Sequence, residues 1–197
     1  LGDGQSVIED YDTVFVGYPI WWDEAPADCH IPGSYDFPET IIPFCTSASD
    51  SIDNSLHIFS EICPDAVIGE ALTANDEADI EPWLQRLGLI SQGDGTAAQG
   101  TASGSHILIA YFFIPETDGT DTVAGASRVA ADGEVLGNNQ YVAQLIQQET
   151  GGDLFRIETV QEYPGTHDAL LEFAYNERQR TPDPSFPHRL KIPTVTM

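Results

Sequence analysis

Basic residues are what this sequence most lacks. Of its 197 residues only 7 are lysine or arginine, against 32 aspartate or glutamate residues, and the formal net charge is −25 at pH 7. A field of that sign repels nucleic-acid phosphates and anionic lipid surfaces, so the composition argues against both as partners. It favours transient encounters with basic patches on other proteins. Solubility or adaptation to high salt is the alternative reason for the charge.

The chain also lacks a long apolar segment and a cysteine framework. No run of about 18 apolar residues is present and no basic start leads into an apolar core, so we expect neither membrane insertion nor a signal peptide. We expect a cytoplasmic protein, with a leader trimmed ahead of Leu1 as the alternative. Cys29, Cys45 and Cys63 are an odd number without metal-ligand spacing, which argues against disulfides and a metal site.

The most informative segment that is present spans residues 12–22. Residues 14–16 (Val-Phe-Val) form a continuous apolar run, which is typical of a parallel strand buried on both faces. Pro19 ends the strand, and Trp21 and Trp22 follow it. Because open α/β sheets bind ligands beyond the carboxyl ends of their strands, the two indole rings are predicted to line a site for a planar redox ring. Packing in the core is the alternative.

Five apolar segments of strand character alternate with amphipathic helical segments. The strands are predicted at about 12–18, 40–46, 66–72, 106–113 and 153–159. Helices are predicted from Ser51 to Cys63, around Ile80 to Leu87, around Tyr141 to Ile146, and from about Thr166 to Arg178. The alternation predicts an α/β fold with three layers, in which helices cover both faces of a doubly wound, five-stranded parallel sheet.

Residues 91–105 interrupt this alternation and are rich in Gly, Ser, Thr, Ala and Gln, which predicts a flexible linker. Three predicted strands precede the linker and two follow it, too few on either side for a separate doubly wound sheet. We therefore expect one domain over residues 1–197, with one sheet shared by both halves.

Several segments resemble the flavodoxin family, but in swapped order. Residues 11–22, 35–37 (YDF) and 40–46 (TIIPFCT) resemble the C-terminal half of a flavodoxin. Its first half is resembled by residues 106–112 (HILIAYF), 137–143 (GNNQYVA), 150–158 (TGGDLFRIE) and 162–164 (EYP). The resemblance implies a circularly permuted flavodoxin: residues 1–90 correspond to the C-terminal half, 106–197 to the N-terminal half, and 91–105 join the original ends. The strands, numbered along this chain, would lie in the order 5-4-1-2-3.

The resemblance further implies a site for flavin mononucleotide (FMN) where the first and fourth strands lie side by side. The phosphate would lie at the start of the helix at residues 137–140, and the flavin ring against the loops after the first two strands. The implied FMN-binding residues are Pro19, Ile20, Trp21, Trp22, Thr46, Ser47, Ala48, Ser49, Phe113, Ser127, Gly137, Asn138, Asn139 and Gln140.

The sequence departs from the family's pattern at three places. A long acidic insertion, residues 114–136, replaces the usual short hydroxyl-rich loop, and Ser127 within it is the candidate to restore a hydroxyl. Asn139 stands where a threonine is usual, and residues 47–49 (Ser-Ala-Ser) replace a His-Gly-Gly-Ser sequence.

These observations predict an FMN-binding protein that transfers electrons, in which the cofactor carries the chemistry and no side chain acts as a catalyst. Its partners would be basic redox proteins or a small-molecule electron acceptor. One alternative is an FMN-dependent reductase that passes hydride from NAD(P)H to a quinone. Another is a flavodoxin-like binding module that has lost its cofactor, which the departures from the family's pattern would explain.

Overall fold

The structure, a computed structural model, describes residues 11–20, 40–47, 49–91, 106–114, 128–131, 133–158 and 162–178. Its strands are β1 (Thr13–Pro19), β2 (Thr40–Thr46), β3 (Val67–Ile68), β4 (Leu72–Thr73), β5 (Ile107–Tyr111), β6 (Arg128–Ala131), β7 (Glu134–Gly137) and β8 (Asp153–Arg156). Its α-helices are α1 (Leu56–Ile62), α2 (Ile80–Arg86), α3 (Asn138–Thr150) and α4 (His167–Arg178), and the short 3-10 helices Ile52–Ser55 and Glu77–Asp79 precede α1 and α2.

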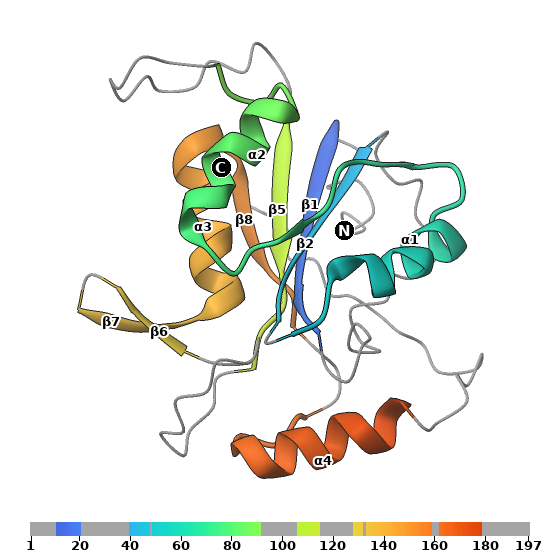
Figure 1. Cartoon of the computed structure of the whole chain (residues 1–197), viewed down its shortest axis with the longest axis vertical. Helices are drawn as coiled ribbons and strands as arrows, with labels where there is room; N and C mark the ends of the chain where they lie inside the picture. Colours follow the sequence, from blue (N-terminus) through green and yellow to red (C-terminus); the bar gives the residue numbers. More distant parts are fainter. Residues whose placement is uncertain are drawn as a thin grey trace, which may run out of the picture.

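A parallel sheet forms the centre of the molecule, with the strand order β3-β2-β1-β5-β8 (Figure 1). β4 also pairs with β2, so β3 and β4 share one edge position. β1 lies in the middle and pairs in parallel with β2, which follows it in the chain, and with β5, which lies beyond the predicted linker. With β3 and β4 counted as one strand, the predicted order 5-4-1-2-3 is confirmed.

Helices cover both faces of the sheet, as the continuous apolar strands predict. Alternate residues of β1 point to opposite faces: Val14 and Val16 pack with side chains of α1 and α4, whereas Phe15 packs with those of α2 and α3. Figure 1 shows α2 and α3 on one side of the strands and α1 on the other. The prediction of a three-layer, doubly wound α/β fold is therefore confirmed.

The third predicted strand, at about 66–72, is not continuous. It forms two strands of two residues each, β3 and β4, and Gly69 between them donates its backbone N–H to the carbonyl of Ile41 at 2.8 Å. Glycine weakens strands, and an edge strand has a neighbour on one side only, which together explain the interruption. Val67 is 63% exposed at this edge.

The last part of the acidic insertion at residues 114–136 has regular secondary structure. β6 and β7 form an antiparallel hairpin that leads directly into α3 (Figure 1). The sequence Asp132-Gly133 is a two-residue hairpin turn signal, and Gly133 has the positive φ of +85° that such a turn requires. The hairpin was not predicted, although this signal is present in the sequence.

The predicted helices are present, with ends set by local chemistry. α3 ends where Gly151 takes a left-handed φ of +73°, and its N–H donates to the carbonyl of Gln147 at 2.8 Å. None of the helices described is long and apolar enough to cross a bilayer. Residues 92–105, nearly all of the predicted linker, lie outside the described residues.

The close contact between β1 and β2 at Gly17 gives a testable prediction. Gly17 pairs with Phe44, and a Cβ atom at Gly17 would overlap the Phe44 ring. Gly17→Ala should therefore lower the free energy of unfolding by about 1–3 kcal/mol, measured by urea denaturation. The double variant Gly17→Ala/Phe44→Leu should lose less than the sum of the two single variants, because the smaller side chain makes room. Strict additivity would contradict the proposed overlap.

Candidate functional site

The carboxyl ends of three neighbouring strands meet at one edge of the sheet. β1 ends at Pro19, β2 at Thr46 and β5 at Tyr111. From β1 the chain winds outward to β2, whereas β5 leads outward on the other side to β8. The direction of winding therefore reverses between β1 and β5, and open α/β sheets bind their ligands outside such a switch point.

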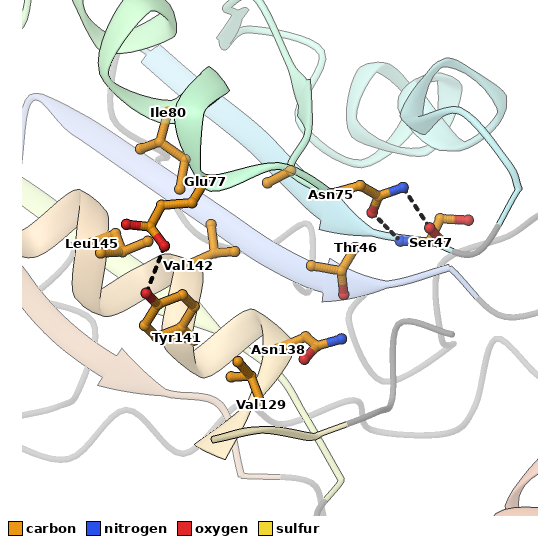
Figure 2. A pocket seen from close by; sticks show the side chains of 11 residues that line it. Thr46, Ser47, Asn75, Glu77, Ile80, Val129, Asn138, Tyr141, Val142 and Leu145 are labelled. Carbon is orange, nitrogen blue, oxygen red and sulfur yellow. Dashed lines mark hydrogen bonds between the residues drawn. The ribbon is translucent and has the colours of Figure 1, made fainter. Parts of the chain in front are cut away.

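A cavity of about 360 Å³ lies beside this edge, and its size is within the range of small-molecule sites. Figure 2 shows side chains from the end of β2, from α2 and from α3 around it. Its lining residues are Thr46, Ser47, Ala74, Asn75, Glu77, Ile80, Val129, Asn138, Tyr141, Val142 and Leu145.

The wall of the cavity after β2 is held by the side chain of Asn75. The backbone N–H of Ser47 donates to Asn75 Oδ1 at 3.0 Å, and Asn75 Nδ2 donates to the Ser47 carbonyl at 2.6 Å (Figure 2). Ser47 Oγ also accepts from the backbone N–H of Asp50 at 3.0 Å. Ser47 is only 3% exposed, so its backbone polar groups are paired within the protein.

A second contact crosses the cavity from the turn before α2 to α3. The Tyr141 hydroxyl donates to Glu77 Oε2 at 2.8 Å, and Figure 2 shows the two side chains meeting. The carboxylate places negative charge on this wall. An anionic ligand group is therefore favoured at the opposite end of the cavity, where Asn138 begins α3.

The start of α3 is built around Gly137, the residue that caps the helix. Its backbone N–H donates to Gln140 Oε1 at 3.4 Å. The Phe113 ring occupies the space that a Cβ atom at Gly137 would take. The ring stacks with Tyr111 at a centroid distance of 6.2 Å, and the guanidinium carbon of Arg156 lies 4.6 Å from its centroid. Glycine is thus required for the helix start to pack on Phe113.

Asn139, the second residue of α3, has a buried side chain without a hydrogen-bond partner. It is fully inaccessible, and neither its Oδ1 nor its Nδ2 is paired among the described residues. It lies on the same face of the helix as Ala143 and Ile146, which pack in the core. An unpaired buried amide costs about 1–3 kcal/mol, so it is rare in native proteins and requires an explanation.

The structure brings together part of the predicted FMN-binding set. Thr46, Ser47 and Asn138 line the cavity. The others at the edge are buried or structural. Pro19 ends β1, and Ile20 follows it and donates its N–H to the Thr46 carbonyl at 3.3 Å. The start of α3 is formed or supported by Phe113, Gly137, Asn139 and Gln140. Ser49 is exposed and is not among the lining residues. Trp21, Trp22, Ala48 and Ser127 lie outside the described residues.

Sequence reasoning missed several lining residues. Asn75 and Glu77 lie between β4 and α2, in a segment that was not predicted to be part of the site. Tyr141 was interpreted only as part of the apolar stripe of its helix. Val129 belongs to the unpredicted hairpin. The polar sequence Asn75-Asp76-Glu77 after a strand is a possible signal, because it lies at the carboxyl edge of the sheet.

Cys45, near the end of β2, is buried and unreactive in character. Burial, the largest cause, raises the pKa of its thiol from 9.0 to about 12; the hydrogen bond to Thr73 lowers it, and the charges of Asp50 and Asp53 raise it further. The Sγ–Oγ1 distance to Thr73 is 3.8 Å. The thiol stays protonated at neutral pH, which suits a structural residue better than a nucleophile.

The sheet order and the ligand edge define a flavodoxin-like α/β protein. Residues 3–87 match a family model described as Flavodoxin, so this part of the chain is similar to the flavodoxin family. The predicted resemblance is thereby confirmed over these residues.

A solved structure of a "putative flavoprotein" from Bacteroides eggerthii DSM 20697 is similar in sequence, with 37% identity and a TM-score of 0.30. The similarity covers 41% of this chain and 54% of that chain, so the match spans about half the length of the Bacteroides protein. No curated protein matches the chain significantly.

Titration of Cys45 should affect stability at alkaline pH. Its pKa is higher in the folded protein than in the unfolded chain, so its contribution to stability is complete below pH 9 and is lost as the pH rises towards 12. Between pH 9.5 and 11 this thiol should lower the free energy of unfolding of the parent protein by about 1.4 kcal/mol per pH unit. Cys45→Ala should abolish this contribution, as measured by urea unfolding at several pH values. Equal slopes for the variant and the parent protein would contradict this assignment.

Proposed function

We propose that this protein binds FMN at the carboxyl edge of its sheet and transfers electrons. A bound flavin would supply the chemistry, which is the uptake and release of electrons. The protein would bind the phosphate, orient the ring and set the electrostatic field. No described side chain needs to act as an acid or a base in this role.

The observation that carries the proposal is the unpaired amide of Asn139 at the start of α3. The first backbone N–H groups of a helix have no partners within the helix and carry partial positive charge, so they attract anions such as phosphate. Asn139 adds a buried donor and a buried acceptor at the same helix start. A phosphate fits the backbone N–H groups, because it accepts hydrogen bonds from them. The amide of Asn139 lies on the core side of the same turn, outside the cavity lining, and would be paired only by a ligand group that reaches behind the helix start.

The ring would lie against the loops that follow β1 and β2. Thr46 and Ser47 supply the wall after β2, and the Ser47 hydroxyl retains a proton to donate, because its oxygen accepts from the backbone of Asp50. Stacking of Trp21 or Trp22 on the ring remains a prediction from the sequence.

The charge of the chain supports an electron-transfer role with basic partners. A net charge of −25 disfavours the addition of an electron to a bound flavin, which predicts a low reduction potential. The same field would speed encounters with proteins that carry basic patches, or leave a small neutral molecule as the acceptor.

We also propose that the chain is circularly permuted relative to other flavodoxins. If the strands are numbered from β5, through β8, β1 and β2 to β3, the observed order becomes 2-1-3-4-5, the order of flavodoxin-like sheets. In this interpretation residues 1–90 supply the C-terminal half, residues 106–197 the N-terminal half, and 91–105 the join.

An absorbance spectrum of the purified protein, before and after incubation with excess FMN and desalting, tests the binding proposal. We expect retained yellow colour and quenched flavin fluorescence. Riboflavin, which lacks the phosphate, is the matched control and should be lost on desalting, because it cannot use the start of α3.

Protein that retains neither ligand would contradict the proposal and favour a binding module without cofactor. Equal retention of both ligands would contradict the phosphate site alone. Rapid turnover of NAD(P)H with a quinone by the loaded protein would identify a reductase instead of a carrier.

Asn139→Leu separates the binding role of the amide from a structural role. Leucine keeps the branching of the side chain and removes both unpaired polar atoms, so the flavin-free protein should be as stable as the parent or more stable by up to about 3 kcal/mol. FMN retention should fall. Urea unfolding and FMN titration measure the two effects.

Asn54→Leu is the matched control, since Asn54 is exposed and lies outside the cavity. It should change neither quantity appreciably. A strongly destabilised Asn139→Leu protein that still binds FMN as the parent does would show that the amide is structural.

A further inference from the structure

We propose that Asn75 is a positioning residue that fixes the flavin-facing loop after β2 at a set separation from α3. This inference rests on the proposed function, because the separation matters only if one ligand contacts the loop with its ring and the start of α3 with its phosphate. Asn75 lines the cavity, but its side-chain amide is bonded to Ser47, so it would act on the ring by positioning that loop.

Asn75 extends the parallel pairing of β2 and β4 beyond its last residue pair. The paired residues end at Cys45 and Thr73, and the backbone N–H of Ala74 then donates to the Cys45 carbonyl at 2.7 Å. At the next position the side chain of Asn75 replaces the backbone and bonds both polar groups of Ser47. A side-chain amide carries the same donor and acceptor as a peptide group, so it can continue the ladder.

The start of the loop, Thr46 and Ser47, is held from both sides. The carbonyl of the preceding residue, Thr46, accepts from the N–H of Ile20 at the end of β1, at 3.3 Å. Asn75 holds Ser47 from the β4 side. The start of the loop is therefore fixed between its two neighbouring strands, and its backbone is preorganised before any ligand arrives.

The turn that carries Asn75, residues 74–77, also contacts α3. Glu77, two residues after Asn75, accepts the hydrogen bond from Tyr141, and Figure 2 shows both contacts around one cavity. The turn at residues 74–77 thus touches the loop after β2 and the helix that begins at Asn138. These two structures come from opposite halves of the chain, and the turn spaces one from the other.

A further consequence concerns which groups of the loop can bind a ligand. Because the N–H of Ser47 is committed to Asn75, it cannot donate to the ring. Donation from Ser47 to a ligand must therefore come from its hydroxyl group, while its carbonyl keeps a second lone pair that can accept. Loss of Asn75 would release the Ser47 N–H and carbonyl together and change the polar environment of the ring.

Asn75→Ala tests the proposal directly. We expect the dissociation constant for FMN to rise about tenfold, since a loop that must be ordered on binding and two lost hydrogen bonds weaken the complex. We also expect a shift in the absorbance bands and the reduction potential of the bound flavin, which a loss of global stability alone would not produce. Asn54→Ala, the same change at an exposed asparagine, should leave all three quantities unchanged.

A measurement on the unaltered protein covers the case in which Asn75→Ala does not fold. Amide hydrogen exchange of the flavin-free protein, followed by NMR, should show strong protection of the Ser47 N–H. Exchange at the rate of an unstructured peptide would overturn the proposal. So would a folded Asn75→Ala protein with the affinity and spectrum of the parent. If the parent protein binds no FMN while the Ser47 N–H is protected, the proposed function is wrong. The role of Asn75 in flavin binding is then wrong as well, although its hydrogen bonds to Ser47 are confirmed.

Discussion

Parallel pairing on both sides of β1 is the constraint on which the rest of the structure depends. β1 joins β2, which follows it in the chain, to β5, which lies beyond the predicted linker. Its residues from Val14 to Val16 are at most 2% exposed, so the hydrogen bonds of this ladder are shielded from water. Because both partners are parallel to β1, their carboxyl ends necessarily meet at one edge, and the two halves of the site are assembled there.

The charge of the chain makes this buried centre necessary. A net charge of −25 opposes compaction through self-repulsion, and the positive charge available for ion pairs is small. Among the residues described, the ion pair between Arg86 and Glu70 is exposed on both sides, with side chains 53% and 50% accessible, and surface pairs of this kind contribute little. Stability must therefore come from the two apolar clusters that sandwich the sheet.

Sequence patterns predicted the elements of this fold well, because burial on both faces and helical periodicity are local signals. The order of the strands in the sheet was predictable only through the family resemblance, because an apolar segment carries no information about which strands will pair with it. The hairpin was missed although Asp132-Gly133 signals it. Asn75 and Glu77 were not predictable as lining residues by spacing, because their contacts with Ser47 and Tyr141 join segments that only the folded sheet brings together.

The two ends of the candidate site differ in how completely their polar groups are paired. At the loop after β2, the N–H and carbonyl of Ser47 are both bonded to Asn75, so a ligand there would relieve no unpaired backbone group and would contact the Ser47 hydroxyl instead. At the start of α3, the buried amide of Asn139 is unpaired, and a partner supplied from outside would remove that cost. Binding energy is thus available at the helix, while the loop supplies shape. This division suits a ligand held by a phosphate at one end and positioned by a rigid wall at the other.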